Sequence, residues 1–134
     1  LGNHMLFSTV PASQYWSAGT HGTKSSIDKH HIFPKNYLSS HLGIKSDRER
    51  NQIANFTYLD YATNIDISDT PPYEYSEIFK ERLGDAAYYE SLRQNAIPEN
   101  FGSLDYFTFL HERRRLMAEM IRRAFNKLRS SSQD

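Results

Sequence analysis

Residues 27–34, with the sequence IDKHHIFP, decide which fold this chain is expected to adopt. The segment is short, apolar at both ends and closed by Pro34, which is typical of a β-strand from Ile27 to Phe33. Two histidines stand side by side within it. Because neighbouring strand residues point to opposite faces, His30 and His31 can serve one site only at a twist or at the end of the strand. Taken alone, the pair indicates one half-buried and one solvent-facing histidine.

A second β-rich segment, Phe56–Leu59 with the sequence FTYL, follows the first after a polar connection. Within the connection, Ser46 and Glu49 have the spacing of a capping box, which predicts a helix from about residue 47 to residue 54. Asp60 is a candidate cap for a short helix that runs through Asn64. The order strand, connection, strand, short helix indicates a small antiparallel pair of strands followed by a helix.

The C-terminal half has the pattern of three helices. The first begins at Pro71-Pro72 and ends at Leu83 before Gly84, and the second spans about residues 85–94. The longest spans about residues 104–128 and is capped by Ser103. Apolar residues recur in it every three or four positions and predict one buried face: Tyr106, Phe109, Leu110, Met117, Met120, Ile121, Ala124, Phe125 and Leu128. The expected fold class is α+β, a small ββα core followed by a mostly helical half.

Length and composition limit the number of domains and the kinds of site that the chain can contain. A chain of 134 residues fits one domain, here predicted over residues 27–128, with an irregular lead-in at 1–26 and a frayed tail at 129–134. Residues 1–5 resemble vector sequence and are expected to take no part in the fold. The absence of cysteine excludes disulfides and thiolate zinc sites, and it favours a reducing, cytoplasmic setting. No apolar run approaches the ~20 residues of a membrane span, so no membrane partner is expected.

The formal charge of zero is unevenly distributed along the chain. Residues 1–50 carry six Lys/Arg and three Asp/Glu, residues 51–105 carry three and ten, and residues 106–134 carry seven and three. Two basic ends around an acidic middle could frame a track for nucleic acid. The same distribution also fits ordinary solvated faces, and charge alone favours that simpler interpretation.

The asparagines that follow the histidines make a functional site at the histidine pair a stronger hypothesis. The relevant segments are HHIFPK at residues 30–35, IANFTYL at 53–59, Asn64-Ile65 and ISD at 67–69. Together they place histidine on a strand, asparagine at the next strand and a second asparagine nine residues later. This arrangement resembles the HNH nuclease superfamily in its HNN variant, and most closely the C-terminal HNH domain of GmrSD-like restriction proteins. The resemblance covers about residues 27–128.

The resemblance implies a role for each matching residue. His31 matches the general base that takes a proton from water, and His30 and Asn64 match the ligands of one divalent metal ion. Asn55 matches the residue that braces the loop holding the base. The implied activity is metal-dependent cleavage of DNA in restriction or anti-phage defence, with an N-terminal domain or partner protein beyond this chain. One imidazole and one amide form a sparse donor set, which suits Mg²⁺ or Mn²⁺ better than structural zinc.

Basic side chains are the candidates for phosphate binding. Lys35, Arg48 and Arg50 lie near the motif, and each phosphate contact would make binding more sensitive to salt. The long helix adds a second group that could track phosphates or dock against another domain: Arg113, Arg114, Arg115, Arg122 and Arg123.

Two features keep other hypotheses open. His31 and Asn55 are separated by a longer connection than in many HNH motifs, so Asn51 competes with Asn55, although it is expected to be a helix residue without a role. The near-zero net charge favours an alternative in which the chain is a nucleic-acid-binding module with an inactive centre. A nuclease directed at RNA is a third hypothesis.

Overall fold

The computed structural model describes residues 5–8, 27–60, 63–64 and 67–132. Strands β1 (Ile27–His31) and β2 (Phe56–Asp60) pair antiparallel, with Ile27 opposite Asp60 and His31 opposite Phe56. The predicted antiparallel pair is therefore confirmed. The first strand ends two residues earlier than predicted, because the amide groups of Ile32 and Phe33 turn to bind Asn55, each over 2.8 Å.

Three short helices connect the strands: α1 (Lys35–His41), α2 (Asp47–Arg50) and the 3₁₀ turn η2 (Ile53–Asn55). The single helix predicted to reach residue 54 is wrong, since α2 ends at Arg50. The side chain of Ser46 makes no capping hydrogen bond, so the capping-box prediction is wrong as well. The helix stops because the Asn55 side chain binds the Arg50 carbonyl and the chain turns toward β2.

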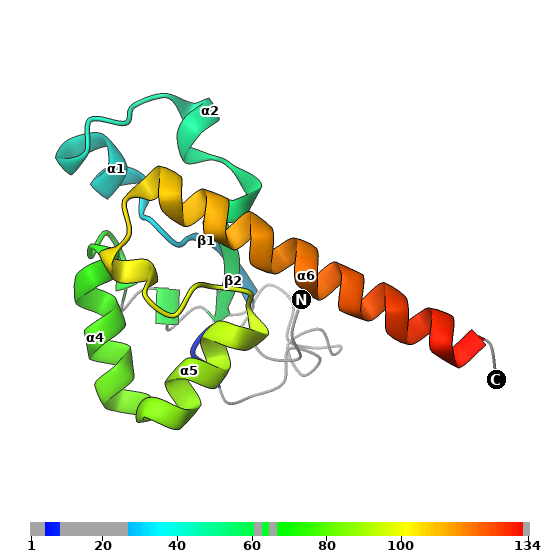
Figure 1. Cartoon of the computed structure of the whole chain (residues 1–134). Helices are drawn as coiled ribbons and strands as arrows, with labels where there is room; N and C mark the ends of the chain where they lie inside the picture. Colours follow the sequence, from blue (N-terminus) through cyan, green and yellow to red (C-terminus); the bar gives the residue numbers. More distant parts are fainter. Residues whose placement is uncertain (1–4, 9–26, 61–62, 65–66, 133–134) are drawn as a thin grey trace.

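The C-terminal half consists of α4 (Pro72–Leu83), α5 (Asp85–Gln94), the 3₁₀ turn η3 (Phe101–Ser103) and α6 (Tyr106–Ser132) (Figure 1). The predicted mostly helical half is confirmed. Asp105 caps α6 by accepting the Thr108 amide over 3.0 Å, a role predicted for Ser103. Residues 129–132, predicted as a frayed tail, continue α6. None of the described helices is long and apolar enough to cross a membrane.

The hydrophobic core is rich in aromatic rings from distant parts of the sequence. Phe7 stacks on Phe79 and on Tyr88, with centroids 4.7 and 5.7 Å apart. The neighbouring Met5 and Leu6 are also buried, and the Leu6 amide donates to the Tyr58 carbonyl of β2. The lead-in was expected to stay outside the fold, but its described part, residues 5–8, belongs to the packed unit. The rest of the lead-in lies outside the described residues.

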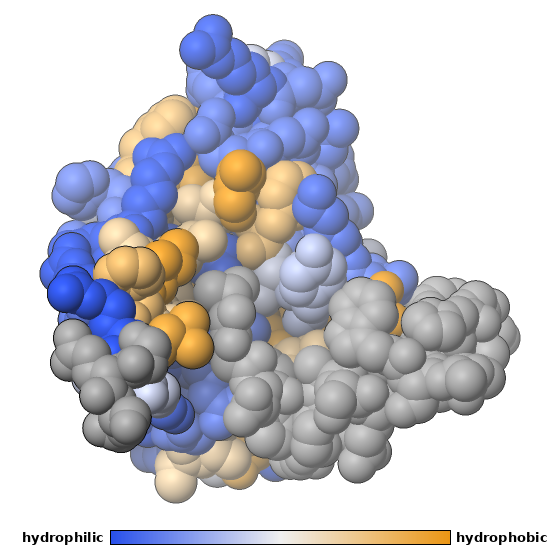
Figure 2. All heavy atoms as spheres, turned by 90° about the vertical axis from the view of Figure 1, so that its right-hand side faces the viewer, coloured by the Kyte–Doolittle hydropathy of each residue, from blue (hydrophilic) through white to orange (hydrophobic). Residues whose placement is uncertain are grey.

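Helix α6 is buried in its first part and exposed in its second. Tyr106, Phe109 and Leu110 are in the core, whereas residues 121–131 are all exposed. The helix runs across the molecule and projects beyond it (Figure 1). Seen from the side toward which it projects, the surface has apolar patches among hydrophilic residues (Figure 2). The single buried face predicted for the whole helix is therefore correct only for its first part.

Candidate active site

His31 is the last residue of β1, and its side chain leaves the sheet toward the end of α2. Its Nε2 atom lies 2.8 Å from Oδ1 of Asn51, and its ring packs beside Phe56 with centroids 4.5 Å apart. An amide oxygen only accepts hydrogen bonds, so this contact places the imidazole proton on Nε2. Nδ1 is then the nitrogen with a free lone pair, as a general base requires.

Asn51 was given no role from the sequence, and the structure makes it the partner of the candidate base. It follows α2 and donates its backbone amide to the Asp47 carbonyl over 2.9 Å. The end of α2 is fixed in turn by the Tyr106 hydroxyl, which donates to the Glu49 carbonyl over 2.6 Å. The signal that could have revealed Asn51 is a break in the helix at Arg50, which the capping-box pattern concealed.

Asn55 lies between the two segments that carry His31 and Asn51. It is fully buried, and its Oδ1 accepts the Phe33 amide over 2.8 Å. Its Nδ2 donates to the carbonyls of Phe33 and Arg50, both over 3.1 Å. These three bonds tie the loop after β1 to the end of α2, which is the geometry of a bracing residue.

Arg113 of α6 supports the backbone on both sides of Asn55. Its side chain is completely buried, and Nη1 donates to the carbonyls of Ala54, over 2.9 Å, and Phe56. Nη2 and Nε donate to the carbonyls that follow α5, at Asn95 and Ala96. Burial lowers the pKa of Arg113 to about 10, so the guanidinium remains charged at neutral pH. Arg113 therefore takes no part in either alternative given for the arginine group, because Nε, Nη1 and Nη2 all donate to backbone carbonyls of the protein.

His30 faces the opposite side of β1 from His31 and is almost completely buried, with its ring edge-to-face on Tyr75. Burial lowers its pKa from 6.5 to about 4, contact with the Asn64 side chain acts in the opposite direction, and the nearby His31 lowers it further. The imidazole is therefore neutral at physiological pH and able to coordinate a metal. Its Nε2 atom is buried and lacks a well-formed hydrogen-bond partner.

The structure brings His30 together with Asn64, the two residues predicted to bind metal, but it places them on the opposite face of β1 from the predicted base His31. Asp28 lies two positions before His30 on the same face of β1, and its Oδ2 is 3.5 Å from Nδ2 of Asn64. In the described residues no three histidine, cysteine or acidic side chains form a ready-made metal group. The candidate donors are instead one imidazole, one amide and one carboxylate. This set fits Mg²⁺ or Mn²⁺ completed by water and phosphate, and the unpartnered His30 nitrogen is consistent with it.

The three cations proposed for phosphate binding have different surroundings. Lys35 and Arg50 share the Asp47 carboxylate, at 3.2 and 2.5 Å. These two contacts hold the pKa of Asp47 below its usual value. Arg50 is mostly buried and also donates to Ser39, so it ties α2 to α1. Arg48 is exposed and the best placed of the three to meet a phosphate.

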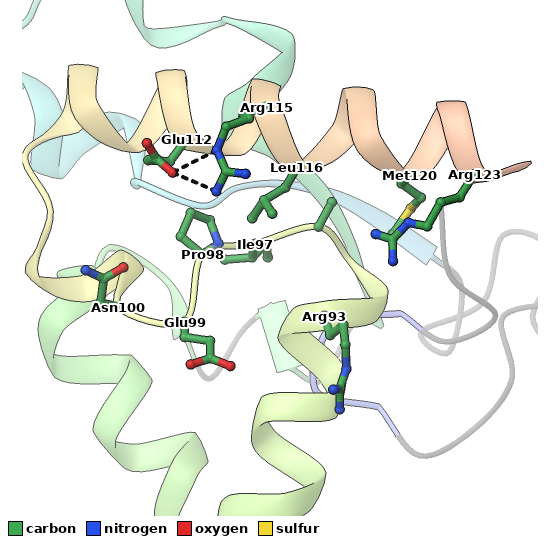
Figure 3. Close-up of a pocket in the computed structure, with 11 residues that line it drawn as sticks. Arg93, Ile97, Pro98, Glu99, Asn100, Glu112, Arg115, Leu116, Met120 and Arg123 are labelled. Atoms are coloured by element: carbon green, nitrogen blue, oxygen red, sulfur yellow. Dashed lines mark hydrogen bonds and ion pairs between the residues drawn. The ribbon is translucent and has the colours of Figure 1, made fainter.

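A pocket of about 310 Å³ lies away from the histidines, between α6 and the segment that follows α5 (Figure 3). Arg93, Ile97 and Glu99 line one side, and Arg115, Leu116 and Met120 line the other. The predicted base, bracing residue and metal ligands do not border it, whereas Arg115 and Arg123 of the second arginine group do. This pocket is therefore separate from the candidate active site, in which His31 is partly exposed at the end of β1 and His30 is buried on the opposite face of the strand.

Comparison with known proteins leaves the family open. No protein-family model matches the chain, and neither a curated protein nor a solved structure matches it.

Proposed function

We propose that this chain is a metal-dependent endonuclease that hydrolyses phosphodiester bonds in DNA, in restriction or anti-phage defence. The observation that supports it best is the hydrogen bond between His31 and Asn51, which orients the imidazole with Nδ1 free. The bracing contacts of Asn55 and the neighbouring pair of His30 and Asn64 add to it. The defence setting and the DNA substrate rest on the resemblance of the motif to the HNH superfamily.

In this mechanism His31 removes a proton from water through Nδ1 as the water oxygen forms its bond to phosphorus. The bond between phosphorus and the 3′ oxygen breaks on the opposite side. Asn51 keeps the imidazole in one orientation while its Nδ1 gains the proton. A divalent ion held by His30, Asn64 and Asp28 would supply positive charge to stabilise the phosphate, and the mechanism requires this charge to reach the phosphate from the face of β1 opposite His31.

The first test is cleavage of supercoiled plasmid in Mg²⁺ or Mn²⁺. We expect nicked product that disappears with EDTA and falls by at least about 100-fold in His31→Ala, the usual contribution of a general base. His41→Ala, on the exposed surface of α1, is the matched control and should cleave like the unmodified chain. Circular dichroism checks that both variants fold.

The same assay separates the competing functions. Full activity in His31→Ala would refute the proposed base. Salt-sensitive binding of duplex DNA without cleavage, unchanged by EDTA, would support the binding module with an inactive centre. Faster cleavage of an RNA than of a DNA of equal length would assign the activity to RNA.

A further inference from the structure

The second part of α6 carries an apolar stripe that no described part of the chain covers. Ile121, Phe125 and Leu128 are 65%, 58% and 69% exposed, and their spacing of four and three residues places them on one side of the helix. Met117, four residues before Ile121, continues the stripe toward the body of the molecule. We call Met117, Ile121, Phe125 and Leu128 the α6 stripe.

At its inner end the α6 stripe opens into an apolar hollow beside η2. The hollow has a volume of about 350 Å³, and Ile53, Met117 and Ile121 lie in its wall together with Gln52, Ala54, Arg114 and Ala118. Ile53 is 77% exposed and extends the apolar surface from α6 onto η2. The exposed apolar surface is thus longer than the α6 stripe alone. Apolar side chains at this helical spacing are typical of surfaces that bind another helix.

The charges around the α6 stripe indicate the sign of the charge that its partner carries. Residues 114–132 contain one acidic side chain, Glu119, and six basic ones: Arg114, Arg115, Arg122, Arg123, Lys127 and Arg129. Arg115 is paired with Glu119 and with Glu112. The net charge of this segment is +5, so pairing with the same helix of a second copy would bring two strongly basic segments together. An acidic partner is favoured instead.

The position of the α6 stripe disfavours two other anionic occupants. Leu110, seven residues before Met117 and so on the same side of the helix, is buried in the core. The stripe therefore faces the angle between the projecting helix and the body, which a flat membrane would not enter. DNA phosphates would satisfy the arginines but would leave the apolar side chains exposed.

We propose that the α6 stripe is the docking surface for an acidic amphipathic helix of a partner protein. The apolar side of that helix covers the stripe and reaches the hollow at Ile53, and its carboxylates pair with the arginines beside the stripe. The proposal does not depend on whether His31 cleaves DNA.

The probe is a fluorescein-labelled helical peptide of about 18 residues, roughly five turns, with leucines on one side and glutamates beside them. A second peptide has lysine at each glutamate position. Titrated with the full chain at low salt, the acidic peptide should bind at least tenfold more tightly than the basic one, and salt should weaken its binding. Ile121→Ser combined with Phe125→Ser should reduce its affinity at least tenfold, whereas Asn126→Ser, on the opposite side of α6, should not.

Three results would overturn the proposal. Equal binding of both peptides, or unchanged affinity in the double variant, would remove the α6 stripe from recognition. Loss of binding to a labelled DNA duplex or to phosphatidylserine vesicles in the double variant, with peptide binding intact, would assign the surface to DNA or to a membrane. A dimer seen by sedimentation that the double variant abolishes would assign it to a second copy.

Discussion

The two parts of α6 have the same pattern of apolar and basic residues but opposite surroundings. Phe109 and Arg113 in the first part are completely buried, whereas Phe125 is 58% exposed and Arg122 lies on the surface. In the first part the helix is covered by the segments that carry the candidate active site, and its arginine is bound by their carbonyls. An amphipathic pattern therefore predicts which side of a helix will be covered, but not whether the cover belongs to the same chain.

The largest difference in the free energy of unfolding is expected between substitutions of Arg113 and Arg122. Arg113→Met leaves four buried carbonyls without their donor, and we expect it to reduce the free energy of unfolding by about 4–5 kcal/mol, or to prevent folding. Arg122→Met should change it by less than about 0.5 kcal/mol. Urea unfolding measures both variants. A loss below about 1 kcal/mol in Arg113→Met would contradict the structural role of this side chain.

Two phenylalanines on the same helix give the next contrast. Phe109→Ala creates a cavity in the core and should cost about 3–4 kcal/mol. Phe125→Ala removes an exposed ring and should change the free energy of unfolding by less than about 0.5 kcal/mol. Similar losses in the two variants, measured by urea unfolding, would show that the second part of α6 is packed in the free protein.

Lowering the pH should reduce the free energy of unfolding through the buried histidine, His30. The folded pKa of His30 is about 4 against 6.5 for an ordinary histidine, so the unfolded chain binds the proton more readily. The stability contributed by His30 is complete above pH 6.5 and is lost as the pH falls toward 4, by about 3 kcal/mol. Unfolding at several pH values in EDTA measures the loss. His30→Gln should remove this part of the pH dependence and His41→Gln should retain it; equal curves for the two variants would exclude His30 as its source.

A small change in stability but a larger change in activity is expected at Asn51, which is exposed. Asn51→Ala should change the free energy of unfolding by less than about 1 kcal/mol, because its partner His31 can turn to water. The proposed nuclease activity should fall by about 10–100-fold, since the imidazole loses its fixed orientation. Asn51→Asp keeps an oxygen acceptor and should recover much of the loss. Nicking rates and urea unfolding of both variants test this, and an unchanged rate in Asn51→Ala would remove the residue from the mechanism.

Local sequence signals predicted the elements that depend on local interactions. The strand at residues 56–60 followed from its β-rich composition, and the helix that ends at Leu83 followed from Pro71-Pro72 and Gly84. The amide of Thr63 donates to the Asp60 side chain over 2.7 Å, so the predicted cap of the next short helix is confirmed. In each case the residues that determine the element lie within or beside it.

The errors arose where distant residues compete for the same backbone groups. Asn55 binds the carbonyl that would otherwise continue α2, and this contact places Asn51 beside His31. Arg113 contacts backbone carbonyls that carry no sequence signature, so its burial could not be separated from the surface arginines around it. Met5 resembles vector sequence and residues 6–8 belong to the predicted irregular lead-in, yet Met5 is buried and Phe7 stacks in the core.

The contact of Arg113 with the carbonyls on either side of Asn55 also determines when the candidate site can be completed during translation. A ribosome makes His30, His31 and Asn55 long before it makes Arg113. Until α6 has emerged and docked, the carbonyls of Ala54 and Phe56 lack their guanidinium donor, and the loop that carries Asn55 is incompletely held. The candidate centre is therefore completed only after α6 has been made and has docked. For a protein proposed to cut DNA, the nascent chain is therefore expected to stay inactive until α6 has docked.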